Sequence, residues 1–184
     1  MALHASIDTL TGIGWNALTS HEHRIAHALR HGLASIPGVR LLGPGPDAGT
    51  LPVAAFTVDG VPHALVAARL SAEEAIGVRH GCFCAHPYLM RLLGHTREDV
   101  HHYREQVRRG DRSAMPGAVR ASAGINTTGD DIARLLAAVA RIARGDAPPV
   151  PYRQDPLTGD FYPCGDFVGG LAQLDPHQAP CSPG

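Results

Sequence analysis

Two cysteines separated by a single residue, Cys82 and Cys84, are the side chains in this sequence best suited to nucleophilic chemistry. They lie in the segment Arg-His-Gly-Cys-Phe-Cys-Ala-His-Pro, which runs from residue 79 to residue 87. Its arginine and its two histidines bring positive charge near the thiols, and positive charge favours the thiolate, the nucleophilic form of cysteine. Free cysteines are also common as small buried core residues, so the pattern alone leaves a purely structural role open.

The same segment contains a pattern of metal-ligand residues. His80, Cys82, Cys84 and His86 alternate along the chain, and in an extended strand this spacing places all four side chains on one face. Zinc binds such ligands, but its structural sites usually separate paired cysteines by two to four residues and draw on two distant segments. We therefore assign no metal site. The alternative function is a non-catalytic fragment, or a thiol- or metal-binding module that uses this cluster.

The elements that position this segment follow from the spacing of apolar residues. Helical periodicity predicts a long helix over residues 15–35, a shorter one over 63–70 and a capped one over 127–144, with a polar surface helix or insertion at 97–109. Strands are expected at 39–42, 52–58, 75–79 and 119–122. This order predicts an α+β fold, in which a small sheet preceded by a long N-terminal helix has helices packed on one face. Residues 1–145 form the expected domain, and the Pro- and Gly-rich residues 146–184 form an extended tail.

The composition restricts the partners of the chain. The formal net charge is -1, which gives no electrostatic reason to expect a nucleic acid or an anionic membrane as partner. The sequence shows no secretory signal, so a cytoplasmic protein is expected. All 16 residues counted as Lys plus Arg are arginines, so no residue of this chain can form a lysine Schiff base.

Four blocks of the sequence resemble the class V aminotransferase family of fold-type I pyridoxal-phosphate enzymes, in particular cysteine desulfurases and selenocysteine lyases. The segment from Val78 to Pro87 resembles the loop Arg-x-Gly-x-x-Cys-Ala-x-Pro of these enzymes. The other blocks occur in the family's order: Ile13-Gly14-Trp15-Asn16 with His21-Glu22, Ile36 to Pro44, and Val119-Arg120-Ala121-Ser122 through Asn126-Thr127 with Asp130-Asp131-Ile132. The resemblance covers roughly residues 7–144 and corresponds to the family's C-terminal small domain.

The resemblance implies a role for each matching residue. Cys84 matches the nucleophilic cysteine that takes sulfur from a cysteine substrate and becomes a persulfide, and Cys82 is a second thiol two positions earlier. Arg120 matches the arginine that binds the substrate carboxylate, and Arg79 matches a loop arginine close to the same site.

The cofactor implied by the resemblance is pyridoxal 5'-phosphate, bound mainly by a large domain that supplies the Schiff-base lysine. We assign no cofactor-binding residue to this chain, because it has no lysine. The expected partners are that large domain, in the same longer chain or in a separate one, a small amino-acid substrate, and a second copy in a homodimer when the enzyme is complete. Without the large domain, the chain is expected to be inactive.

Overall fold

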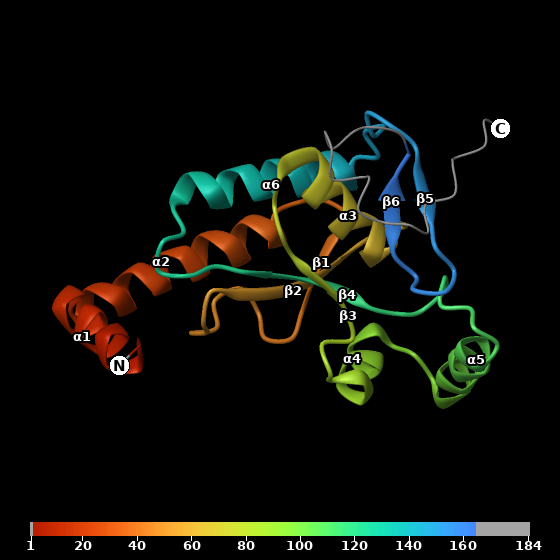
Figure 1. Cartoon of the computed structure of the whole chain (residues 1–184), viewed down its shortest axis with the longest axis horizontal. Helices are drawn as coiled ribbons and strands as arrows, with labels where there is room; N and C mark the ends of the chain where they lie inside the picture. The colour runs from red at the N-terminus through yellow and green to blue at the C-terminus, as the bar shows by residue number, and fades with distance from the viewer. Residues whose placement is uncertain (1, 165–184) are drawn as a thin grey trace.

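The computed structural model describes residues 2–164, in which a four-stranded antiparallel sheet lies at the centre (Figure 1). Its strands are β1 (Val39–Leu42), β2 (Val53–Val58), β3 (Arg79–Gly81) and β4 (Ala118–Ser122). They lie in the order β1-β2-β4-β3, so the short strand β3 forms one edge of the sheet. The segment that carries Cys82 and Cys84 therefore leaves the sheet at an edge.

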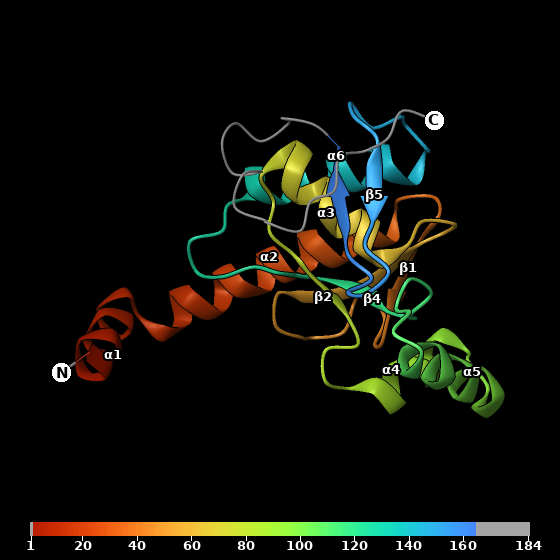
Figure 2. The same cartoon turned by 45° about the vertical axis from the view of Figure 1, so that its right-hand side comes forward.

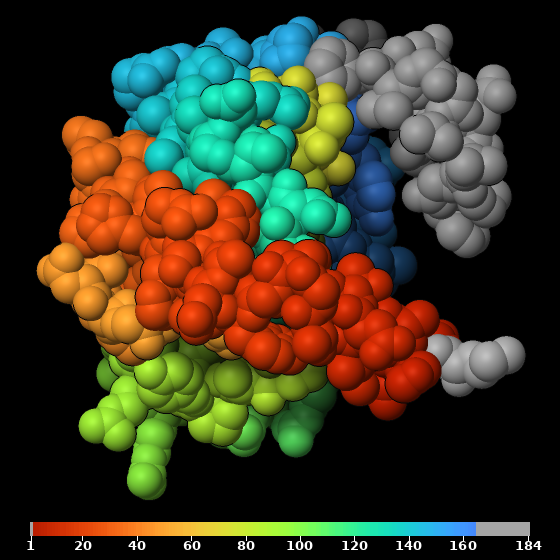
Figure 3. Space-filling model, turned by 90° about the vertical axis from the view of Figure 1, so that its left-hand side faces the viewer, coloured from red at the N-terminus to blue at the C-terminus, as the bar shows by residue number. Residues whose placement is uncertain are grey.

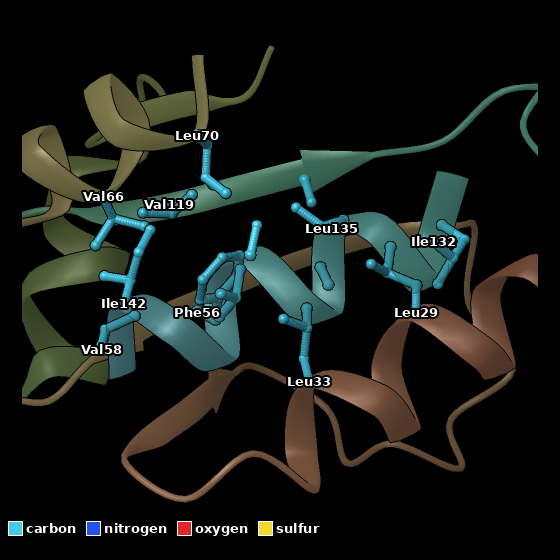
Figure 4. Close-up of a cluster of buried hydrophobic side chains, with 14 of the residues drawn as sticks. Leu29, Leu33, Phe56, Val58, Val66, Leu70, Val119, Ile132, Leu135 and Ile142 are labelled. Carbon is cyan, nitrogen blue, oxygen red and sulfur yellow. The ribbon is translucent and has the colours of Figure 1, made fainter. Parts of the chain in front are cut away.

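Three helices cover one face of this sheet: α2 (Trp15–Ala34), α3 (His63–Glu74) and α6 (Gly129–Ala143). Strand residues alternate between the two faces, so Phe56 and Val119 point toward these helices. Both are fully buried, together with Leu33 of α2 (Figure 4) and Val139 of α6. This helix-covered face contains the main hydrophobic core.

Capping boxes fix the first turns of two helices. Thr128 accepts a hydrogen bond from the backbone N–H of Asp131, whose carboxylate accepts one from the backbone N–H of Thr128, and α6 begins there. Thr96 and Asp99 form the same pair at the start of α5 (Arg97–Arg108). Such caps satisfy backbone donors that the first helical turn leaves without partners.

The opposite face of the sheet is covered at one side only. There α4 (His86–Leu93) packs Leu89 and Met90 against Leu42 of β1 and Ala118 of β4, in a second, smaller hydrophobic cluster. Helix α5 follows α4 directly, and the two lie together on the side of the sheet away from α2 and α6 (Figure 2). The uncovered remainder of this face is where Arg79 and Arg120 lie.

Two elements extend the fold at its ends. Helix α1 (Ala2–Ile13) buries none of its residues and projects from the body of the molecule (Figures 1 and 2), and Figure 3 views the molecule from that side. Near the other end, β5 (Tyr152–Gln154) and β6 (Phe161–Pro163) form an antiparallel hairpin beside α3. The hydroxyl of Tyr152 donates a hydrogen bond to Glu73 of α3.

The predicted α+β fold is confirmed, and most of the expected elements lie within one or two residues of their expected ends. The helix expected at 63–70 continues to Glu74, and α4, which was not expected, packs on the opposite face of the sheet. The strand expected at 75–79 is wrong, because Ala75 ends α3 in a left-handed conformation and pairing begins only at Arg79. The extended tail is also wrong for residues 152–163, which form the hairpin, and its remainder, 165–184, lies outside the described residues. The boundary at residue 145 stays a prediction.

Candidate active site

The two predicted substrate-binding arginines lie side by side on adjacent strands. Arg79 of β3 pairs in register with Arg120 of β4, so both side chains point to the same face of the sheet. This is the face that α2, α3 and α6 leave free, and it carries the side chain of Ala55 beside Arg120. The structure thus brings together two residues that are 41 positions apart in the sequence.

The guanidinium of Arg120 has no anionic partner among the described residues. Its Nε atom is buried without a hydrogen-bond partner within residues 2–164, and the half-buried side chain lies over the ring of Phe83, 5.2 Å from the ring centre. A cation over an aromatic face is attracted by the ring electrons. The guanidinium is thus held in place while its hydrogen-bonding capacity for a carboxylate stays unused.

Phe83 and Cys84 turn the chain between β3 and α4. Both residues adopt the left-handed conformation, with φ of 51° and 57°. This conformation is uncommon for residues other than glycine, and it ends the extended segment after Gly81. The Cys84 side chain is free and exposed at this turn.

Cys82 is the less accessible of the two thiols. Its sulfur donates a hydrogen bond to the Pro116 carbonyl at 3.4 Å and lies 3.2 Å from Nδ1 of His86. Burial raises the pKa of the Cys82 thiol, because the thiolate loses hydration. The surroundings of Cys82 therefore favour the neutral thiol, which is the less reactive form.

His63 and His80 form a pair that the sequence did not predict, and both line one pocket with Cys82. His63 of α3 contacts His80 through their Nδ1 atoms at 3.3 Å, and its Nε2 donates to the carbonyl of Met115 at 3.0 Å. The Nε2 atom of His80 lies 3.3 Å from Asp160 in the hairpin. Burial lowers the pKa of His63, because the imidazolium loses hydration. No local motif links residues 63, 80 and 160, so only the packing of α3 and the hairpin reveals this cluster.

The four alternating metal-ligand residues do not gather into one site. Because the strand ends at Gly81, His80 turns toward α3 while His86 begins α4 and contacts only Cys82 of the set. Among residues 2–164, no group of three or more His, Cys, Asp or Glu side chains is placed to hold a metal ion. The geometry gives the metal-binding alternative no support within that part of the chain.

Comparison with known proteins identifies the family of the chain. Residues 1–135 match the family model described as aminotransferase class-V. The chain belongs to the class V aminotransferase family. A probable cysteine desulfurase of Pseudomonas aeruginosa is 34% identical over 141 residues, which are 77% of this chain and 29% of that protein. Another from Synechocystis is 36% identical over 107 residues, which are 56% of this chain and 25% of that protein.

Solved structures of family members share the fold. The apo structure of a cysteine desulfurase from Thermococcus onnurineus superimposes with a TM-score of 0.59 at 26% identity, covering 77% of this chain and 30% of that one. A cysteine desulfurase from Escherichia coli gives a TM-score of 0.50 at 27% identity, covering 70% of this chain and 26% of that one. The chain thus spans between a quarter and about a third of the length of these relatives.

The family implies pyridoxal phosphate as cofactor, but the residues of this chain do not fit its covalent attachment. Attachment as a Schiff base needs a lysine amine, and the sequence contains no lysine. The free face of the sheet offers an unpaired guanidinium, and the turn after β3 offers an exposed thiol. Among the described residues, no helix is both long and apolar enough to cross a membrane.

Proposed function

We propose that this chain is the substrate-binding and thiol-bearing portion of a pyridoxal-phosphate enzyme of the cysteine-desulfurase type. The observation that carries the proposal is the Arg120 guanidinium, which has no anionic partner in residues 2–164 and is held over Phe83, the residue directly before the exposed Cys84. A site that must bind an amino acid and accept its sulfur needs both groups. The named relatives support this reading.

Arg120 binds the carboxylate of the substrate. A planar guanidinium makes two parallel hydrogen bonds to a carboxylate, and an unpaired buried Nε gains most from such a partner. The neighbouring Arg79 is exposed, and its positive charge attracts the same anion to this face of the sheet. We assign Arg120 to direct binding and Arg79 to a supporting role.

Cys84 accepts the sulfur. Its thiolate forms an S–S bond to the substrate sulfur while the C–S bond of the substrate breaks. The electron pair of that bond stays on the carbon, which takes up a proton, so that alanine is released and a persulfide is left on the protein. Stabilising the carbon that is left behind is the chemistry that a bound pyridoxal phosphate supplies. Cys82 is not the nucleophile, because its sulfur is half-buried and engaged by Pro116 and His86.

The remaining parts of the enzyme come from outside this chain. A large domain, in a longer form of the same chain or in a separate one, provides the lysine and binds the cofactor. The complete enzyme is a cytoplasmic homodimer that acts on a small amino acid. By itself the 184-residue chain has no turnover, because no lysine is present to form the Schiff base.

The carboxylate-binding role is tested with a tagged copy of the gene expressed in the native host, where any other polypeptide that it needs is present. Sulfide release is measured with cysteine and with cysteamine, which has the same thiol and amine but no carboxylate. Arg120→Gln should lower kcat/KM for cysteine roughly 10- to 150-fold, the effect expected from losing a charge-assisted hydrogen bond. It should leave kcat/KM for cysteamine unchanged.

The exposed Arg24 of α2 is the control, because Arg24→Gln makes the same charge change away from this face and should change neither value. Equal losses for both substrates in Arg120→Gln would mean that the arginine supports the fold and does not bind the carboxylate.

A further inference from the structure

A concave groove of about 780 Å³ lies between α4 and α5, next to the turn that carries Cys84. Its floor is apolar and includes Pro87, Met90 and Val100. Met90 is buried in the second hydrophobic cluster, and Val100 packs against the same cluster. The floor is therefore fixed by the packing of the domain.

The rim of this groove is positively charged. Arg91, Arg97 and Arg104 line it and are exposed, and none of the three forms an ion pair with a described residue. Three histidines also line it: His86, His95 and His101. No aspartate or glutamate is among the lining residues, although the chain as a whole carries a net charge of -1.

Two acidic side chains of α5 that lie near the groove already have partners. Asp99 accepts hydrogen bonds from the backbone and the hydroxyl of Thr96 in the capping box, and Glu105 pairs with Arg108. Glu98 lines a neighbouring hollow, which shares Arg97 and His101 with the groove. Asp99 also lies 4.0 Å from Nδ1 of His95 and offsets the charge of that histidine when it is protonated, whereas Arg91, Arg97 and Arg104 form no ion pair with a described residue.

We infer that this groove binds an acidic, amphipathic peptide segment of a partner protein, whose apolar side chains lie on the floor and whose carboxylates meet the arginines of the rim. Arginine is suited to the rim because its planar fork matches a carboxylate. The first residue of α4, His86, contacts Cys82 and lies two positions after Cys84, so a partner bound here lies next to the exposed thiol. The identity of that partner as the acceptor of sulfur from Cys84 rests on the proposed function, whereas the binding of an acidic segment does not.

A direct binding measurement tests the inference on the full 184-residue chain. The probe is a fluorescein-labelled ten-residue peptide of alternating glutamate and leucine pairs, followed by fluorescence anisotropy at low ionic strength. A peptide with glutamine in place of every glutamate is the matched probe. The acidic peptide should bind, and its affinity should fall at high salt because exposed charge pairs are screened. The glutamine peptide should bind at least tenfold more weakly than the acidic one.

Two triple variants locate the site. Replacing Arg91, Arg97 and Arg104 by glutamine removes the charge of the rim, and all three are exposed, so the fold is retained. This variant should bind the acidic peptide roughly tenfold more weakly, as expected for the loss of three exposed ion pairs. The control replaces Arg24, Arg108 and Arg144 by glutamine, which makes the same charge change at exposed positions outside the groove and should change affinity less than twofold.

Equal binding of the two peptides, or equal losses in the two triple variants, would overturn the inference. So would tighter binding of a single-stranded oligonucleotide to the same rim, because it would identify a different class of partner. The assay uses neither the cofactor nor the thiol, so Cys84→Ser should bind the acidic peptide as the wild-type chain does. A failure of the proposed sulfur transfer would therefore leave this result unchanged.

Discussion

The unequal surroundings of Cys82 and Cys84 predict unequal rates of alkylation. At pH 7.5 an ordinary exposed thiol with a pKa of about 8.5 is roughly one-tenth thiolate. Each unit by which burial raises the pKa of Cys82 lowers its thiolate fraction about tenfold, and the Pro116 carbonyl and His86 also cover its sulfur. Cys84, free and exposed, should therefore react with iodoacetamide at least about five times faster than Cys82.

Mass spectrometry of quenched samples measures both rates on the native chain. Trypsin cleaves after Arg79 and Arg91, so both thiols lie on the peptide of residues 80–91, and fragment ions must separate them. Cys84→Ser should remove the fast phase, and Cys82→Ser should leave it intact. Equal rates at the two positions, or faster modification of Cys82, would refute the assignment of Cys84 as the reactive thiol.

Three further predictions test the fold that positions the site. Phe56→Ala should lower the free energy of unfolding by about 3–5 kcal/mol in urea denaturation, because the ring is fully buried, whereas Leu51→Ala at an exposed position should change it by less than about 0.5 kcal/mol. Gly117→Ala should destabilise the chain more than Gly124→Ala when the two variants are compared by thermal unfolding. A Cβ at residue 117 would lie 2.8 Å from the backbone of β3, whereas none of the described atoms lies within 4 Å of a Cβ at residue 124. Since burial lowers the pKa of His63 below its unfolded value of about 6.5, its contribution to stability is present above pH 6.5 and is lost as the pH falls through the folded pKa. Urea midpoints at pH 8 and pH 5.5 should therefore differ less in His63→Gln than in the wild type, and an equal difference would contradict the effect of burial.

Strong periodicity made the central elements predictable from the sequence. The apolar stripe of α2 and the capped stripe of α6 correspond to two of the three helices that cover the core. Helix α1 gave no such signal, because none of its residues is buried and its apolar side chains therefore follow no core-facing pattern. The hairpin was missed because its strands have only three residues each and lie in a Pro-rich segment.

The candidate site was predictable in its residues but not in its shape. Pro87 was read as part of a loop, yet it lies in the first turn of α4, where its missing N–H costs no hydrogen bond. The four metal-ligand residues would be aligned only in an extended segment, and Phe83 and Cys84 interrupt it with a left-handed backbone conformation. No residue pattern in the sequence predicts that conformation. The approach of Arg79 to Arg120 depends on strand register, which is set by packing across the whole sheet.

The central claim, sulfur transfer to Cys84, is tested most directly by locating the persulfide. The tagged protein is isolated from its native host, incubated with ³⁴S-labelled cysteine and trapped with an alkylating reagent. Fragment ions of the peptide of residues 80–91 then show which cysteine carries the added sulfur. We predict ³⁴S persulfide on Cys84, retained in Cys82→Ser and absent in Cys84→Ser. Label on Cys82 alone, or persulfide that persists in Cys84→Ser, would contradict this account.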